Sequence, residues 1–137
     1  MTAVEEMVEE LCLPGRAEAE SAITRLMRQG RPAFVLTVLA TGVPGINEQY
    51  GYTAGDRVLA DLAGRLACTS GMSRELFRWS ATSFLIVSQS VTGIRKASTL
   101  TDASTAVFSI WPQDRPGAVF DRIDDYIVAE LAGVQPS

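Results

Sequence analysis

The chain has 137 residues, of which 47% are hydrophobic and 20% charged, and its net charge is −4. These values describe one ordinary folded domain and exclude a generally disordered chain. The negative charge and scattered Lys and Arg residues argue against nucleic-acid binding, the absence of His excludes His-based zinc and nucleophile sites, and every apolar run is far shorter than the roughly 20 residues of a membrane span.

The N-terminal residues predict a short amphipathic helix. Glutamates form one face of this helix. The apolar residues recur at helical spacing on the other face, and they are Val4, Met7, Val8 and Leu11. The first residues are acidic, whereas a secretory signal would begin with Lys or Arg and an apolar core. We therefore expect one cytoplasmic domain over residues 1–137, with this helix in residues 1–12 and the core in residues 13–133.

The first half of the core predicts two long helices around a central strand. Residues 17–29 have helical periodicity closed by Gly30, and residues 33–40 are almost continuously apolar, which is typical of a strand buried on both faces. Residues 46–50 predict one short helical turn. A clear helix follows over residues 56–67, with Asp56 at its start and one apolar face formed by Val58, Leu59, Leu62 and Leu66.

The second half predicts a hairpin followed by helix, strand and helix. The hairpin strands cover residues 75–79 and 83–88, and the later elements cover residues 94–100, 106–111 and 119–131. The complete order predicts an α/β fold in which a single mixed β-sheet is flanked by helices.

Two motifs in this order resemble signatures of the GGDEF family of diguanylate cyclases. The run INEQYGYTAGDRVL, which begins at Ile46, is similar to the family pattern I-N-D-x-x-G-H-x-x-G-D-x-x-L. The run RWSATSF, from Arg78 to Phe84, falls where the family has R-Y-G-G-D-E-F. LPGR from Leu13 and FSI from Phe108 resemble the family's L-P-N-R and V-S-I. The resemblance covers about residues 8–133 and implies a nucleotidyl cyclase-like fold with a ferredoxin-like core.

The resemblance implies a cyclase site whose metal ligands have been replaced. Active members condense two GTP molecules with Mg²⁺ held by carboxylates against the triphosphate. The family's aspartate at the end of the first strand corresponds to Leu39, and the acids of the hairpin signature correspond to Thr82 and Ser83. Without these carboxylates we expect no bound metal, no cofactor and no cyclase activity.

The phosphate-binding positions of the family differ as well. Its two hairpin glycines correspond to Ser80 and Ala81, whose side chains occupy the approach to a nucleotide. Two family lysines correspond to Pro44 and to about Glu130. The family's R-x-x-D product-binding motif falls on residues 71–74, where neither end of the motif is present.

Only the positions that contact guanine in active relatives are retained. Asn47 and Asp56 match the two that hydrogen-bond the base, and Leu59 matches an apolar contact; an amide and a carboxylate can together read the guanine edge. Each residue also has a structural interpretation. Asn47 is suited to a turn or cap, and Asp56 to the start of a helix.

Two further groups of residues have structural interpretations that we prefer. Trp79 and Trp111 could stack on a ligand, but core packing is the simpler expectation for both. The closing helix carries three acids that could be substitute metal ligands, although an exposed helical face is the better prediction: Asp121, Asp124 and Asp125.

The sequence therefore leads to a non-catalytic regulatory module in bacterial, cyclic di-GMP-related signalling. We expect it to act through contact with another signalling protein or through self-association. The alternative is a receptor for a guanine nucleotide or cyclic di-GMP that uses Asn47 and Asp56. A third possibility is an active cyclase with rearranged ligands.

Overall fold

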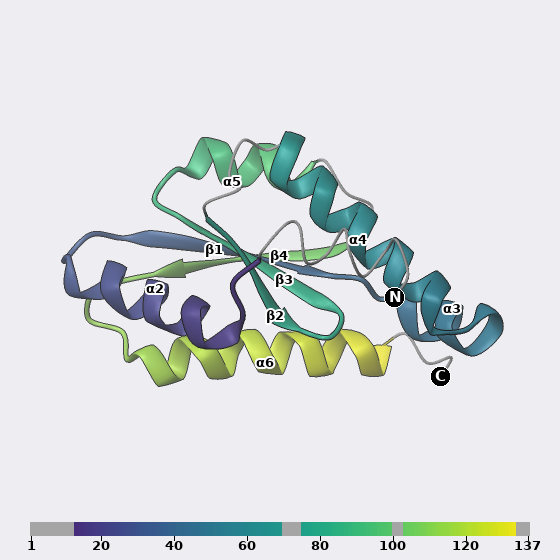
Figure 1. Ribbon diagram of the computed structural model, residues 1–137. Helices are drawn as coiled ribbons and strands as arrows, with labels where there is room; N and C mark the ends of the chain where they lie inside the picture. Colours follow the sequence, from purple (N-terminus) through teal and green to yellow (C-terminus); the bar gives the residue numbers. More distant parts are fainter. Residues whose placement is uncertain (1–12, 70–74, 100–102, 134–137) are drawn as a thin grey trace.

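The computed structural model describes residues 13–69, 75–99 and 103–133 (Figure 1). The helix predicted in residues 1–12 and the product-site match at residues 71–74 lie outside this part of the chain. The strands are β1 (Ala33–Leu39), β2 (Leu76–Ser80), β3 (Ser83–Ser88) and β4 (Ser104–Ile110). The helices are α2 (Arg16–Arg28), α3 (Val43–Tyr50), α4 (Tyr52–Thr69), α5 (Val91–Ser98) and α6 (Pro116–Gly133).

The four strands form one sheet in the order β2-β3-β1-β4. All three neighbouring pairs are antiparallel, so the prediction of a single sheet flanked by helices is confirmed but the expected mixed pairing is not. The strands β1 and β2 do run in the same direction, but β3 lies between them. The helical connection from β1 to β2 leaves room for this insertion, so parallel strands never become neighbours.

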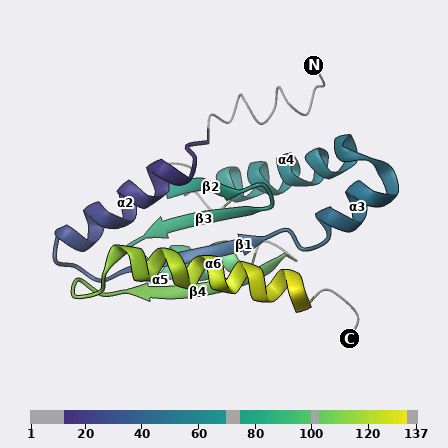
Figure 2. The ribbon, with the colours of Figure 1, turned by 90° about the horizontal axis from the view of Figure 1, so that it is seen from below.

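Helices cover both faces of the sheet. Figure 1 shows α4 and α5 on one side and α2 and α6 on the other, and Figure 2 shows α2 at the β2 side of the sheet and α6 at the β4 side. Alternate residues of β1 enter the two cores: Val35 and Leu39 pack towards α2 and α6, whereas Leu36 and Val38 pack towards α4 and α5. The prediction of a first strand buried on both faces is thus confirmed. None of the described helices is long and apolar enough to cross a bilayer.

Most predicted helices begin earlier in the structure than in the sequence analysis. The helix α3 begins at Val43 because Pro44 is tolerated in a first helical turn, where its missing N–H has no intrahelical partner. The helix α4 begins at Tyr52, directly after Gly51, whose φ of 89° separates the two helices. The helix α5 begins at Val91 because the Ser90 side chain caps it. The helix α6 has Pro116 as its first residue.

Candidate functional site

The tip of the β2–β3 hairpin lies against the end of β1. In the register of the sheet, Leu39 is opposite Ser83. The next backbone N–H, that of Ala40, donates to the Thr82 carbonyl over 2.9 Å. The structure therefore brings together Leu39 and Thr82, the two positions matched to metal ligands, and Ser83, matched to the acid beside the second ligand, although they come from separate segments.

These three positions form an apolar and hydroxylic corner without a carboxylate. Leu39 and Ser83 have no exposed surface, and the Leu39 side chain belongs to the core beneath α2 and α6. The Ser83 hydroxyl is hydrogen-bonded to the hydroxyl of Ser80, and the Thr82 N–H donates to Ser80 Oγ over 3.4 Å. Mg²⁺ prefers carboxylate oxygens, so this donor set does not fit the ion. Across the described residues, no three His, Cys, Asp or Glu side chains are grouped as metal ligands.

Arg78 holds the shape of the hairpin turn. Its guanidinium donates to the carbonyls of Ser80 and Ala81 over 3.3 and 2.9 Å, and it lies 6.0 Å from the centre of the Phe84 ring. This cation therefore binds the backbone of its own turn. In this glycine-free turn the three carbonyls and the Ser80 hydroxyl are all hydrogen-bonded to neighbouring groups of the protein.

The predicted guanine contacts lie at the junction of α3 and α4. Asn47 packs against α4 so closely that a Cβ on Gly55 would lie 1.7 Å from Asn47 Oδ1. This oxygen is buried and has no hydrogen-bond partner. Asp56, the next residue after Gly55, is half-buried. Because α4 begins at Tyr52, Asp56 lies in its second turn rather than at its start.

The remaining predicted contact, Leu59, is part of the core rather than of an open pocket. Only 5% of it is exposed, whereas Val58, which we expected to face inward, is 38% exposed. A shallow cavity of about 230 Å³ lies beside α4, lined by the loop after β1 and by Val58, Leu62 and Arg65. Arg65 pairs with Asp61 on the same helix over 3.3 Å. This cavity offers no carboxylate to a ligand, and its lining includes neither Asn47 nor Asp56.

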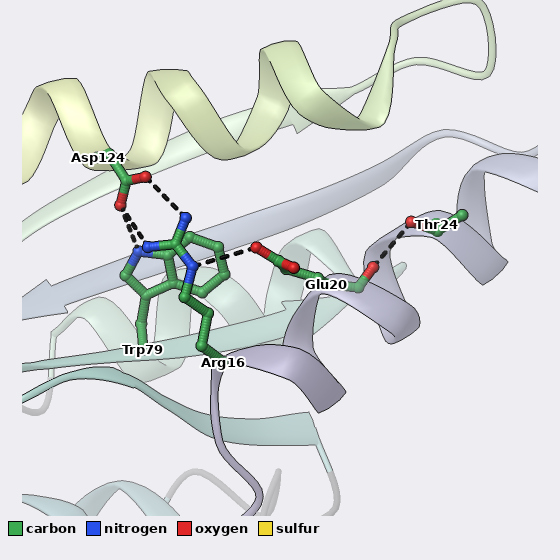
Figure 3. A network of polar contacts seen from close by, with 5 residues as sticks. All are labelled: Arg16, Glu20, Thr24, Trp79 and Asp124. Atoms are coloured by element: carbon green, nitrogen blue, oxygen red, sulfur yellow. Dashed lines mark hydrogen bonds and ion pairs between the residues drawn. The ribbon is translucent and has the colours of Figure 1, made fainter.

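A polar network missed by the sequence analysis joins α2, β2 and α6 (Figure 3). Arg16 donates from both terminal nitrogens to the Asp124 carboxylate, over 2.9 and 2.8 Å. The same guanidinium lies 4.0 Å from the centre of the Trp79 ring, and the Trp79 indole N–H donates to Asp124 over 2.9 Å. Arg16 also pairs with Glu20 over 3.1 Å. The hydrogen bond from Arg16 is the main reason why the pKa of Asp124 is lowered.

For these tryptophans and for the acids of the closing helix, the structure corrects two expectations and confirms one. Asp124 is half-buried and bonded, so the closing helix does not present all three of its central acids as a simple exposed face. Trp79 is buried at 3% exposure, as predicted. Trp111 is 49% exposed and lies beyond the end of β4, so the prediction of core packing was wrong for it.

Glu130, which occupies a lysine position of the family, is also engaged within the fold. Its carboxylate accepts a hydrogen bond of 2.8 Å from the Ser104 hydroxyl at the start of β4. This contact fastens the last turns of α6 to the edge of the sheet. The group that replaces a cation of the family thus has a structural partner.

Solved structures with the same fold are GGDEF domains and diguanylate cyclases. The GGDEF domain of PA1120 (YfiN or TpbB) from Pseudomonas aeruginosa is 21% identical, with a TM-score of 0.66 over 93% of this chain and 95% of that chain. The GGDEF domain of DgcB from Caulobacter crescentus, solved in complex with c-di-GMP, is 17% identical, with a TM-score of 0.59 over 90% of this chain and 88% of that one.

A longer relative has the same core. The diguanylate cyclase SiaD from Pseudomonas aeruginosa, solved in complex with its activator SiaC, is 17% identical with a TM-score of 0.65, and the match covers 89% of this chain but only 56% of SiaD. No curated protein matches this chain in sequence. The family model described as diguanylate cyclase, GGDEF domain, matches residues 12–117. With its antiparallel sheet, its hairpin at the end of β1 and this match over most of its length, the chain belongs to the GGDEF family.

Proposed function

We propose that this chain is a non-catalytic GGDEF domain that regulates cyclic di-GMP-related signalling by contact with another protein or with itself. The observation that carries the proposal is the corner formed by Leu39, Thr82 and Ser83. These positions adjoin one another where the resemblance implies metal ligands, and none of the three residues has a carboxylate. Two-metal phosphoryl transfer depends on such ligands to hold Mg²⁺ against the triphosphate.

The local packing supports a lasting loss of chemistry rather than a rearranged site. Leu39 is embedded in the core, the Ser80 and Ser83 hydroxyls are bonded to each other, and Arg78 is bonded to the carbonyls of the turn. Three of the replaced residues, Leu39, Ser80 and Ser83, therefore have packing or hydrogen-bonding roles in the fold. A domain that keeps the fold but lacks the metal ligands for catalysis can still provide a surface for binding another protein.

The test is an incubation of the full chain with GTP and Mg²⁺, followed by chromatography of the products. An active diguanylate cyclase under the same conditions serves as the positive control. We expect no cyclic di-GMP above the level without protein. Product that disappears in Asp56→Ala would instead identify an active cyclase with rearranged ligands and would refute the proposal.

One observation favours a second function, a receptor for a guanine nucleotide or cyclic di-GMP. The buried Asn47 Oδ1 lacks a hydrogen-bond donor. This oxygen lies close to Gly55, and Asp56 is the next residue in the chain. A guanine N–H could supply the missing donor after a small movement of the Asn47 side chain. Without a phosphate-binding turn, base contacts alone would give weak binding.

Calorimetric titration separates the two functions. Under the receptor hypothesis GTP, GMP or cyclic di-GMP releases heat, and both Asn47→Ala and Asp56→Ala abolish the signal. Glu48→Ala, at an exposed neighbouring position, is the matched control and should leave it unchanged. Absence of heat with all three nucleotides would favour the protein-contact function.

A further inference from the structure

The two edges of the sheet differ in how they are protected. An edge strand exposes unpaired N–H and C=O groups, and natural proteins block such edges with charges, prolines, bulges or covering segments. The β2 edge has several of these devices. The Pro14 carbonyl accepts from the Arg78 N–H over 2.8 Å, Arg78 is charged, and the pairing of β2 with β3 shifts register between Arg78 and Ser80.

Among the residues that the structure describes, none of these devices is found at the β4 edge. Its seven residues, STAVFSI, include neither a charge nor a proline. Its register with β1 runs without a shift from Ser104 to Ile110. Within the described part of the chain no other strand pairs with its outer side, and Figure 2 shows β4 at the margin of the sheet. A straight, uncharged strand of this length is a template for another strand.

One face of β4 is also only partly covered by the described helices. Val107 is paired with Leu36 and so lies on the face of the sheet that α4 and α5 cover, but α5 packs on β1 and β3. Val107 is consequently 51% exposed. The opposite face is held by α6, where the rings of Phe108 and Tyr126 lie 6.0 Å apart. Within the described part of the chain, the strand is thus packed on one face and partly exposed on the other.

We propose that the β4 edge is a self-association surface, on which β4 of a second copy adds antiparallel about a two-fold axis near Val107. The two sheets would then be continuous across the pair. This inference rests on the proposed protein-contact function and names a partner for it.

Charge is the reason for choosing a second copy as the partner. In a two-fold pair a side chain at the axis faces its own copy, so any charge near the axis would face a like charge. The β4 strand has no charge to repel its copy, and pairing about Val107 places Thr105 opposite Ser109. The first acid after the C-terminal end of the strand, Asp114, is bonded to the Trp111 N–H over 2.9 Å and to Arg122 over 3.4 Å.

Sedimentation velocity of the full chain over a range of concentrations tests this proposal. We expect a monomer–dimer equilibrium in which Val107→Lys raises the dissociation constant roughly tenfold or more, because two ammonium groups meet at the axis. The matched control is Val128→Lys on α6, where the valine is 66% exposed, and it should leave the constant unchanged. A wild-type chain that stays monomeric, or equal constants for the two variants, would overturn the proposal.

Charge complementation makes the test specific for the two-fold pair. Val107→Glu should also dissociate alone, whereas an equimolar mixture of Val107→Lys and Val107→Glu should form heterodimers, detected by a tag on one variant. In the wild-type chain, amide hydrogen exchange gives a reading without mutation: β4 amides should become more protected as concentration rises. A monomeric chain that makes no cyclic di-GMP would refute the second copy alone, whereas a dimeric chain that makes cyclic di-GMP would refute the proposed function.

Discussion

Asp124 connects three elements through one carboxylate, because it accepts from Arg16 at the start of α2 and from Trp79 in β2. The bidentate geometry with Arg16 is the strong form of an ion pair. Both partners are partly solvated, however, with 43% and 38% of their side chains exposed. Solvent therefore screens the pair and limits its contribution to stability.

We predict that Asp124→Asn lowers the free energy of unfolding by about 1 kcal/mol, measured by urea denaturation at neutral pH. The amide can still accept from Trp79, but it cannot replace the charge opposite Arg16. Asp125→Asn, at an exposed acid on the same helix, is the control and should change stability by less than about 0.5 kcal/mol. Equal effects of the two variants would show that the network does not stabilise the fold.

The same network predicts a pH dependence. Because the Arg16 hydrogen bond holds the pKa of Asp124 below its ordinary value of 3.8, the folded state favours the carboxylate. The stabilisation is therefore complete above that value and is lost as the pH falls through the lower, folded pKa. The stability difference between the wild type and Asp124→Asn should be constant near neutral pH and shrink below about pH 4. A difference that grew on acidification would contradict this assignment.

Leu39 shows how firmly the altered site is built into the core. We predict that Leu39→Asp lowers the free energy of unfolding by about 3 kcal/mol or more, since it places a carboxylate without a partner at a fully buried position. Leu39→Met, a control of similar volume, should cost less than about 1.5 kcal/mol. If thermal melts gave both variants the same stability, the side chain at this position would have to reach solvent.

At the scale of elements, the sequence predicted which segments are helices and strands better than where they begin. Residues 17–29 and the hairpin strands were predicted to within a residue of α2, β2 and β3, because periodicity and Gly30 mark them clearly. The starts of α3 and α4 were missed because Pro44 and Gly45 look like breakers and Tyr52 carries no cap signal. Contacts between α3 and α4 stabilise these weak first turns.

Two glycines of α4 give a matched stability test. Gly64→Ala should raise the free energy of unfolding by roughly 0.5–1 kcal/mol, because alanine favours helix and a Cβ there meets no atom within 4 Å. Gly55→Ala should gain less, since its Cβ would displace the Asn47 carboxamide. In a background of Asn47→Ala the two substitutions should become equal in urea denaturation. Equal gains in the wild-type background would refute the close contact.

At the scale of the whole molecule, the arrangement of the strands and helices determines which distant residues become neighbours and which side chains are exposed, and sequence patterns do not contain this information. The motifs around Asn47 and Arg78 predicted the family, and the register of the sheet places Leu39 opposite Ser83 of the hairpin. Sequence patterns contained no signal for the Arg16–Asp124 pair, because its members lie at opposite ends of the chain. They also could not predict that Trp111 is exposed, since this depends on where β4 ends and on what covers the sheet edge.

A self-associating edge has a measurable effect on the stability of the whole chain. Since a dimer of folded chains is favoured by mass action, the melting temperature of the wild type should rise with protein concentration. Val107→Lys should weaken this dependence and Val128→Lys should retain it. Calorimetric scans over a wide concentration range provide the measurement, and a wild-type melting temperature independent of concentration would contradict the edge pairing.

The contacts of residues 14 and 16 with β2 have a mechanical consequence. Pro14 is bonded to the backbone of Arg78, and the guanidinium of Arg16 lies on the ring of Trp79, so two successive residues of β2 are gripped from the chain that leads into α2. A force applied to the polypeptide at Leu13 would therefore be transmitted directly to β2, the strand that leads into the hairpin turn.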